Sequence, residues 1–323
     1  MGQKMIRRTT KDDIGAIEEL YSHSKNNLEL SWLLPDPLAH HPFRSFVAVL
    51  DNKIVGHIGY VVSKFKYNES EFKGVHPQAW IVSPEYRGHG IGLKLVHKVL
   101  DMGDFSYLIG GSKATMRIFP FLGFKLKFFV LEYVKPLESP YIVQQLETEK
   151  DTISLEEYNK NEARKIQHSK FTFVNAQEDN HIQWLLDCPL CDTYAFSVKQ
   201  NGKPLGIAVC YIGRNNDDIL TGRIVHLSYL GDDLIPWQNT LFEIEKFFRD
   251  KGCLVASTLA THPTYVKALI DNGYSQRPSY PVSAFNENGR PFFFRDPKKN
   301  LPDIPDKSFH WTFFEGDMGY RNF

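Results

Sequence analysis

Apolar residues along the first 135 positions alternate between short strand-like runs and segments with helical spacing. Ile14, Ile17 and Tyr21 share one face of a helix that follows the acidic residues Asp12 and Asp13. Apolar side chains three and four positions apart line one side of a helix, whereas continuous or alternating apolar runs are typical of strands. Further helices are predicted at 91–102 and 113–122, and strands at 5–9, 46–50, 54–62, 72–82, 106–110 and 128–134, with the last strand closing the sheet.

The second half repeats this order of elements. A predicted hairpin with strands at 193–199 and 204–211 parallels the hairpin at 46–62, and each second strand begins with an apolar residue followed by glycine, Val55-Gly56 and Leu205-Gly206. A strand at 223–229, a helix at 236–250, a strand at 253–259 and a helix at 263–272 follow. The last helix of each half ends at a glycine and an aromatic residue, Gly123-Phe124 and Gly273-Tyr274, and glycine after a helix is the usual left-handed cap. These correspondences predict a duplicated unit.

The pattern divides the chain into residues 1–135, a connector at 136–168 and residues 169–323. The connector begins with prolines and continues as a charged, nearly glycine-free run, whereas both flanking regions are rich in strands. Phe292–Phe294 and residues 309–314 are strand-like, and we interpret the phenylalanine triplet as a core or edge strand in preference to a ligand-facing wall.

Composition narrows the class of protein. The 323 residues are 42% hydrophobic and 14% aromatic, which is typical of a globular chain. Basic and acidic residues are equal at 38 each, so no excess positive charge favours nucleic acid or an anionic membrane. No apolar run approaches the about 20 residues that span a bilayer. The start lacks the apolar core of a secretion signal, and we expect a cytoplasmic protein.

The four cysteines predict reduced thiols and no metal site. Cys188 and Cys191 form a lone CxxC pair, and Cys210 and Cys253 lie singly in apolar runs. A zinc site would need a second pair of ligands. We therefore interpret the cysteines as structural.

The glycine-rich turn at residues 87–92 is the strongest functional signal. It follows a predicted strand and opens directly into a helix, with glycines at 88, 90 and 92 and a cation at Arg87. The first turn of a helix presents backbone N–H groups without partners and a partial positive charge, and glycine lets a bulky anion approach. The spacing fits neither a dinucleotide-binding fingerprint nor a P-loop. The turn therefore predicts a pyrophosphate site of another kind.

The pattern Arg87-x-x-Gly90-x-Gly92, preceded by Val82-Ser-Pro-Glu-Tyr86, resembles the coenzyme A pyrophosphate loop of the GNAT superfamily of acyl-CoA N-acyltransferases. The resemblance covers residues 1–135 well and the second half only in element order. It implies an α+β fold with two GNAT-like domains, each a central, mostly antiparallel sheet flanked by helices, and acetyl-CoA or another acyl-CoA as cosubstrate. The residues implied in coenzyme binding are Ile81 and Val82, which pair with the pantetheine arm, and Arg87, Gly88, His89, Gly90, Ile91 and Gly92, which hold the pyrophosphate.

The resemblance implies direct attack of a primary amine on the thioester, but the proton donor to sulfur is missing. The position where the family commonly has that tyrosine is Phe119, and an asparagine often found at the start of the same helix is replaced by Ser112. The thiolate leaves unassisted or through water, another acid acts, or the chain binds coenzyme A without turnover. General acid assistance is worth about 10²–10⁴-fold, so its loss slows the reaction without forbidding it.

Replacement groups for proton transfer are few. His76 is a candidate base on the strand that leads to Val82, and Tyr107 lies on the neighbouring predicted strand; for both residues the favoured alternative is a structural role. His57 lies in a hairpin strand, and its side-chain direction is open. Glu315 and Asp317 are candidates for holding a cationic acceptor, with solvated acids as the alternative.

The second half diverges at the position of the glycine-rich turn. There the chain reads Leu230-Gly-Asp232-Asp233-Leu-Ile-Pro236, and two carboxylates at a helix start suit an ordinary cap but repel pyrophosphate. We expect this half to be a degenerate partner without a coenzyme loop.

Three functions are compatible with the sequence. The first is an N-acetyltransferase acting on a small-molecule amine, which balanced charge favours over a nucleic-acid-linked target; a homodimer is left open. The second is a coenzyme A-binding sensor without turnover, which Phe119 favours. The third is aminoacyl transfer, for which a tRNA partner would need a basic surface that the composition does not indicate.

Overall fold

The computed structural model describes residues 4–22, 42–111, 113–137, 152–163, 173–175, 179–189, 191–215, 217–277, 290–299 and 301–312. The chain forms two compact units, the first made of residues 1–64, 72–108 and 294–302, and the second of the remainder. Several expectations lie outside the described residues: those on Ser112, Glu315 and Asp317, and those on most of the connector.

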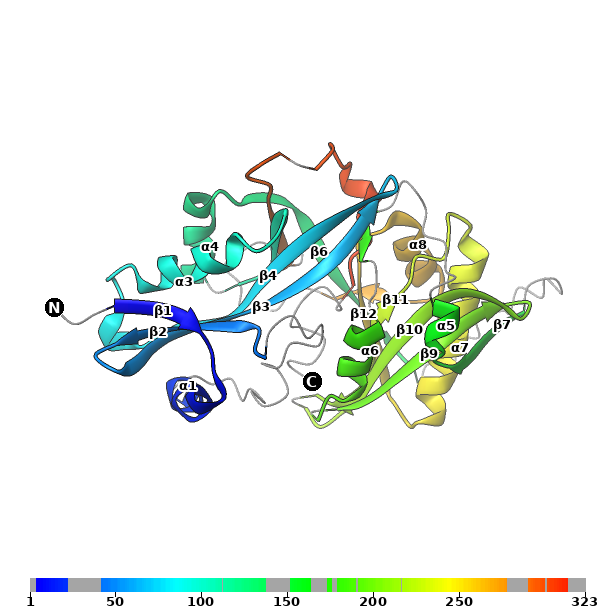
Figure 1. Ribbon diagram of the computed structural model, residues 1–323. Helices are drawn as coiled ribbons and strands as arrows, with labels where there is room; N and C mark the ends of the chain where they lie inside the picture. The colour runs from blue at the N-terminus through cyan, green and yellow to red at the C-terminus, as the bar shows by residue number, and fades with distance from the viewer. Residues whose placement is uncertain are drawn as a thin grey trace. The chain divides into compact units, whose positions relative to one another are not determined.

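The first unit contains a sheet in the order β1-β2-β3-β4-β5, of which β1 to β4 are labelled in Figure 1. β1 pairs with β2 and β2 with β3 in antiparallel register, whereas β4 and β5 are parallel. The two-residue turn Asp51-Asn52 has positive φ at both positions, which suits a tight hairpin. The strands are β1 (Lys4–Arg8), β2 (Ser45–Leu50), β3 (Lys53–Tyr67), β4 (Ser70–Val82) and β5 (Phe105–Ile109), and the tip of the β3–β4 hairpin, residues 65–71, is assigned to the second unit.

Helices α1 (Ile14–Ser22) and α3 (Ile91–Leu100) cover opposite faces of this sheet (Figure 1). A Cβ atom at Gly56 of β3 would lie 3.1 Å from Leu95 of α3, whereas the next residue, His57, contacts Tyr21 of α1. Successive strand residues point to opposite faces, so the two helices lie on opposite sides. Gly56, one of the paired apolar-glycine positions, therefore admits α3 onto the sheet.

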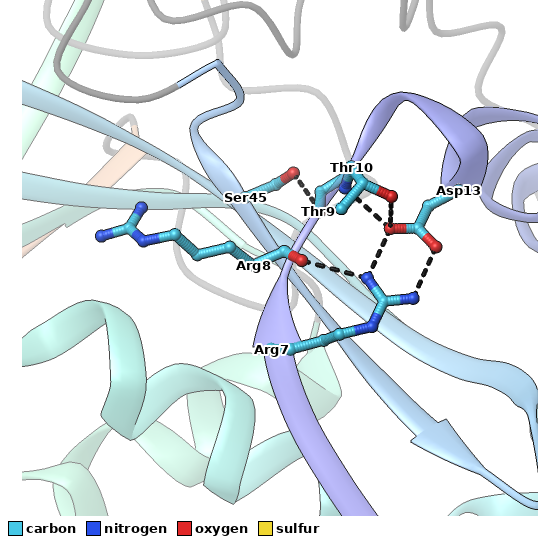
Figure 2. Close-up of polar contacts among 6 residues, drawn as sticks. All are labelled: Arg7, Arg8, Thr9, Thr10, Asp13 and Ser45. Carbon is cyan, nitrogen blue, oxygen red and sulfur yellow. Dashed lines mark hydrogen bonds and ion pairs between the residues drawn. The ribbon is translucent and has the colours of Figure 1, made fainter.

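The start of the first helical segment is tied to β1 by an ion pair (Figure 2). The 3-10 turn η1 (Lys11–Asp13) ends at Asp13, whose carboxylate accepts from Arg7 at 2.6 and 2.7 Å and from the backbone N–H of Thr10 at 2.7 Å. These hydrogen bonds lower the pKa of Asp13 to about 2, and the bond from Arg7 has the largest effect. Behind it, Ser45 donates to Thr9 at 2.6 Å. The acidic helix start predicted from sequence is thus part of a local capping network.

The second unit contains a sheet in the order β6-β12-β11-β10-β9-β7, antiparallel except for the parallel pair β11–β12. Its long strands are β6 (Lys125–Pro136), β7 (Ile153–Glu157), β9 (Asp192–Gln200), β10 (Lys203–Arg214), β11 (Leu220–Leu227) and β12 (Val255–Ala260). The remaining elements are η2 (Pro84–Tyr86) in the first unit, α4 (Lys113–Ile118), η3 (Phe119–Leu122), α5 (Lys160–Ala163), β8 (Val174–Asn175), α6 (Asp179–Leu186), α7 (Leu234–Asp250), α8 (Pro263–Asp271), β13 (Ser275–Gln276), β14 (Arg290–Arg295), which crosses the division between the units, and η4 (Asp306–Ser308).

The fold class predicted from the sequence is confirmed: the molecule is α+β, with mostly antiparallel sheet flanked by helices. The order β2-β3-β4-α3-β5-α4 recurs as β9-β10-β11-α7-β12-α8. The predicted glycine caps also hold, because Gly123 and Gly273 have φ of 83° and 86°. The domain boundaries at 135 and 168 stay a prediction.

Two expectations about strands are wrong. β6 does not pair with β5: β14 lies between them in the strand order, and β6 pairs on its other side with β12 over Leu131–Pro136 and with β13. Residues 309–312 form no ladder strand, since Thr261 Oγ1 donates to Phe309 O at 2.8 Å and accepts from Trp311 N at 2.9 Å. Their apolar pattern reflects burial among aromatic rings, with Phe309 stacked on Trp311 at 6.1 Å. The triplet is in β14, with Phe292 fully buried, as expected of a core strand.

Candidate functional site

The glycine-rich turn connects η2 to α3 in a backbone conformation that glycine permits. Gly88 has φ 79°, and Gly90, at the N-cap of α3, has φ 70° and ψ 8°. A residue with a side chain at either position would be strained in this left-handed region. The helix bonding begins with Lys94 N–H donating to Gly90 O at 3.1 Å, and no side chain caps this end of α3. The N–H groups of residues 91–93 thus precede the first helical bond, as an anion site requires.

The three glycines of the turn serve two different purposes. A Cβ atom at Gly88 or Gly90 would meet nothing within 4 Å, so the backbone there is open to approach. At Gly92, in the first turn of α3, a Cβ atom would lie 3.1 Å from Nε1 of Trp80. Gly92 therefore admits the indole of β4 against the helix, a packing role that the spacing of the motif did not reveal.

The two polar side chains of the turn fold back onto its backbone. Arg87 is exposed, and its Nε donates to Val82 O at 3.1 Å. Nδ1 of His89 lies 2.9 Å from Arg87 O. The guanidinium group is thereby tied to the end of β4, next to the turn, where a cation would reinforce an anion site.

The outer edge of β4 loses its partner before the strand reaches this turn. β4 and β5 pair only at Gly74 with Phe105 and Val75 with Ser106, although β4 continues to Val82. Ser83 N donates to Val55 O at 2.9 Å, which orients the bonding groups of Ser83 toward β3.

Alternation along the strand then separates the two residues expected to pair with pantetheine. Ile81 O lies 3.3 Å from the Cβ position at Gly56 of β3, so Ile81, like Ser83, directs its backbone groups to β3. Val82 faces the other edge, which β5 leaves unpaired over these described residues. Of the two, Val82 faces the open edge; its carbonyl already accepts from Arg87 Nε, so its N–H is the backbone group that it offers to a ligand.

A backbone irregularity interrupts β4 at Ala79, whose φ is +48°. The hydroxyl of Tyr21 donates to Ala79 O, and His57 Nδ1 lies 3.2 Å from the same oxygen and 3.1 Å from the Tyr21 hydroxyl. His57 is fully buried, and this burial lowers its pKa to about 4. His57 is thus neutral near pH 7 and bonded within the fold, which argues against a role as a base that exchanges protons with solvent.

His76 and Tyr107, the two candidates for proton transfer, lie together. Nδ1 of His76 is 3.1 Å from Tyr107 O, and the two rings stack with centroids 5.2 Å apart. Both side chains are buried, and each residue is one position beyond the last β4–β5 pair. The side-chain bond therefore connects the strands at the point where their ladder ends.

Phe119 is buried at the start of η3. Its ring is 5.0 Å from Phe293 and 5.7 Å from Phe124, in edge and tilted arrangements. The residue offers no proton, and its surroundings are aromatic.

The corresponding turn of the second unit is built differently. Asp233 accepts from Ile235 N at 3.2 Å and caps α7, as the sequence predicted, and Asp232 accepts from the hydroxyl of Tyr229. The start of α7 thus carries its own carboxylate. Pairing between β11 and β12 ends at Ile224 with Thr258.

Beyond that last pair, the chain's own segment 309–312 occupies the ends of the two strands. His310 Nε2 lies 2.6 Å from Leu227 O, and Trp311 N donates to Thr261 Oγ1 at 2.9 Å. One bond reaches the end of β11 and the other reaches the residue after β12.

Among the described residues, no cluster of three or more His, Cys, Asp or Glu side chains could hold a metal ion. The Sγ atoms of Cys188 and Cys191 are 3.8 Å apart, and neither they nor the buried Cys210 and Cys253 form a disulfide. Helices long and apolar enough to cross a membrane are absent from the described part of the chain.

Sequence reasoning missed the contacts around Ala79. It placed Tyr21 on the apolar face of its helix, which the structure bears out, but nothing indicated that the hydroxyl reaches a strand carbonyl. Alanine has no preference for positive φ, so the irregularity has no local signal. Strand alternation alone could have separated Val82 from Ile81.

Comparison with known proteins agrees with this architecture. Residues 11–104 match the family model described as Acetyltransferase (GNAT) family. No curated protein matches the sequence significantly.

Solved structures resemble the chain over most of its length. A GCN5-related N-acetyltransferase from Anabaena variabilis has a TM-score of 0.61 at 13% identity, with 91% of this chain and 73% of that one covered. A probable N-acyltransferase from Enterococcus faecalis has a TM-score of 0.62 at 14% identity, covering 92% and 73%. N-myristoyltransferase from Saccharomyces cerevisiae, with bound myristoyl-CoA, has a TM-score of 0.57 at 11% identity, covering 92% and 83%.

Proposed function

Because residues 11–104 match the GNAT acetyltransferases and the chain has the GNAT superfamily fold, we propose that it is an acyl-CoA-dependent N-acyltransferase. The acyl donor is most simply acetyl-CoA, and the acceptor is the primary amine of a small molecule. The observation that carries the proposal is the uncapped start of α3, where Gly88 and Gly90 leave the backbone open and Arg87 is held alongside.

The coenzyme follows the turn and the unpaired edge of β4. The N–H groups of residues 88–92 and Arg87 bind the pyrophosphate, and the backbone N–H of Val82 donates to the pantetheine arm. The thioester then reaches β4 upstream of Val82. There the planarity of the trans peptide directs Trp80 N–H opposite to Ala79 C=O, toward the same edge as Val82.

The amine attacks the thioester carbonyl, and negative charge develops on its oxygen. A backbone N–H that is already oriented stabilises this charge without reorganising, which makes Trp80 N–H the proposed oxyanion donor. The tetrahedral intermediate then collapses, the C–S bond breaks and the amide remains. Residues of the second unit take no part in pyrophosphate binding in this proposal, because Asp233 already caps α7.

Proton transfer is assigned to few groups. His76, with Tyr107, is the proposed base for the ammonium, directly or through water. Since Phe119 has no proton to give, the thiolate leaves unassisted, through water or with a different acid. In a pH–rate profile, His76→Gln would remove the limb that a titrating base produces, whereas a merely structural histidine would leave the limb in place.

Balanced charge supports a small-molecule amine in the cytoplasm over a nucleic-acid-linked acceptor, and the proposal is compatible with a homodimer. The second candidate function is a coenzyme A sensor without turnover, which Phe119 favours. The two differ in one measurement. Calorimetry with acetyl-CoA reports binding, and the release of free thiol in the presence of an amine panel reports transfer.

Two substitutions test the coenzyme site itself. Arg87→Glu reverses the charge beside the turn, and Gly90→Val cannot keep φ near 70°, so each should weaken acetyl-CoA binding at least about tenfold. Asp232→Ala and Asp233→Ala are matched controls at the second turn, and coenzyme affinity should stay unchanged. Loss of affinity in the controls, or none in the first pair, would place the coenzyme elsewhere.

A further inference from the structure

We propose that Tyr21 and His57 are positioning residues that hold the carbonyl of Ala79 and thereby aim the N–H of Trp80 at the acyl carbonyl. The inference rests on the proposed acyl transfer and assigns a role to two side chains that touch neither coenzyme nor acceptor.

Ala79 holds a conformation that alanine avoids. Its φ of +48° lies in the left-handed region, inside a strand that is otherwise extended. Strained backbone persists only where the surroundings determine it, and it concentrates at functional sites. The question is therefore which contacts hold this peptide in place.

Two side chains from different elements converge on the carbonyl oxygen of Ala79. Tyr21 reaches it from α1, and its hydroxyl donates to the oxygen. His57 reaches it from β3, with Nδ1 at 3.2 Å. The Tyr21 hydroxyl and His57 Nδ1 are also 3.1 Å apart, so the hydroxyl, the ring nitrogen and the Ala79 carbonyl all contact one another.

The contacts determine how His57 is protonated. A carbonyl oxygen only accepts, so Nδ1 carries the proton that it donates. Nε2 is buried and has no hydrogen-bond partner in the described structure, which suits the nitrogen without a proton. Burial lowers the pKa of His57 to about 4, which keeps the ring in this neutral form. His57 is thus a fixed donor and not a proton carrier.

Holding the carbonyl of Ala79 also orients the next N–H. The peptide unit is planar and trans, so Trp80 N–H points away from the Tyr21–His57 pair. The indole of Trp80 is fixed separately, against Gly92 at the start of α3. The peptide between Ala79 and Trp80 is therefore restrained by α1, by β3 and by the helix that carries the proposed pyrophosphate site.

The test removes single donors while keeping the size of each side chain. Tyr21→Phe deletes only the hydroxyl, His57→Leu deletes the ring donor, and His57→Asn restores an N–H donor near the position of Nδ1. Tyr60→Phe is the matched control, since Tyr60 is a buried tyrosine of β3 whose hydroxyl accepts from Arg8 at 2.9 Å. Thermal melting establishes that each variant is folded.

Three quantities are measured: kcat for acyl transfer, the Kd for acetyl-CoA, and the infrared carbonyl band of bound acetyl-CoA labelled with ¹³C. Tyr21→Phe and His57→Leu should each lower kcat about tenfold, since loss of an oriented donor weakens transition-state stabilisation. Kd should stay within about twofold, because binding energy comes from the turn. The carbonyl band should move toward its value in free acetyl-CoA, and His57→Asn and Tyr60→Phe should resemble the wild type.

The outcomes separate this inference from the proposed function. If the wild type transfers acyl groups but Tyr21→Phe and His57→Leu keep its kcat and its carbonyl band, the positioning role is overturned and the function stands. If the wild type binds acetyl-CoA but releases no thiol with any amine, the proposed transfer fails. The carbonyl band still decides the positioning role in that case. If affinity for acetyl-CoA and kcat/KM fell by the same factor, the substitutions would have disturbed the whole site, and the inference would be overturned.

Discussion

Replacing Lys135 with methionine should destabilise the second unit, because it leaves a buried carboxylate without its main partner. Lys135 Nζ lies 2.6 Å from Glu245 Oε2, and the two side chains are 3% and 1% exposed. The pair joins β6 to the centre of α7. Methionine keeps the length and apolar stem of lysine, so the change removes charge more than volume.

The magnitude follows from the contacts that remain. At an effective dielectric constant of about 20, unit charges 2.6 Å apart attract by about 6 kcal/mol, and desolvation cancels much of this. Breaking a buried pair on one side usually costs about 3–5 kcal/mol. Glu245 keeps a second partner, Arg249, at 3.1 Å, but that side chain is 36% exposed. We therefore expect a loss of about 2–4 kcal/mol in the free energy of unfolding.

The loss should depend on pH with a definite sign. Burial raises the pKa of Glu245, and Lys135 counteracts this, so the substitution raises that pKa further. A carboxyl group whose pKa is raised in the folded state is neutral at low pH and does not destabilise the fold there. As pH rises it must ionise while buried, and this lowers the stability. Urea unfolding, followed by circular dichroism, should show a larger loss at pH 8 than at pH 5.5.

The double variant Lys135→Met with Glu245→Leu is the control. Removing both charges should restore stability to within about 1 kcal/mol of the wild type, or exceed it. The explanation by a buried charge would be refuted if Lys135→Met alone lost less than about 1 kcal/mol of unfolding free energy at pH 8, or lost the same amount at pH 5.5 and pH 8.

Three further substitutions test local features of the first and second units. Asp13→Asn should lower the free energy of unfolding by about 1–2 kcal/mol at pH 7, a modest loss because its partner Arg7 is 34% exposed. In urea titrations the wild type should lose this contribution as pH falls from about 4 toward 2, and the stability of the variant should change less over the same range. Gly222→Ala places a Cβ atom 2.5 Å from the ring of Phe248, and should lower stability by about 1–3 kcal/mol in thermal melts; an unchanged melt would mean that α7 moves freely. Gly88→Ala has open space, so only its φ of 79° opposes the change; we expect about 1 kcal/mol of strain and a soluble, folded protein, and aggregation would contradict this.

The glycine-rich turn at residues 87–92 was the part of the candidate site most accessible from the sequence. Its glycines, its cation and its place between a strand and a helix are local features, and local chemistry decides how such a turn folds. Gly88 and Gly90 do adopt positive φ, as an open turn requires. Gly92 was assigned to the same function, yet its environment depends on Trp80, twelve positions earlier in the chain.

Positions whose role depends on distant partners escaped prediction. β6 has the apolar pattern of a closing strand, but the pattern cannot say that β12 pairs with it. Residues 309–312 look like a strand because they are buried, while their polar groups bond to Thr261. The sequence named His76 as a candidate base and left the direction of the His57 side chain open; only the contacts with Tyr107 and Ala79 showed their surroundings.

By itself, the sequence determined the mixed class of the fold and the order of its strands and helices, and it located the glycine-rich turn at residues 87–92 between a strand and a helix. Periodicity, capping and glycine placement act over a few neighbouring residues, so they can be read along the chain. Only the tertiary structure decided which strands pair, which edge of β4 stays open, and that Tyr21 and His57 meet at Ala79. These features arise from contacts between segments far apart in the chain, and neither alanine's propensity nor the hydrophobic pattern contains them.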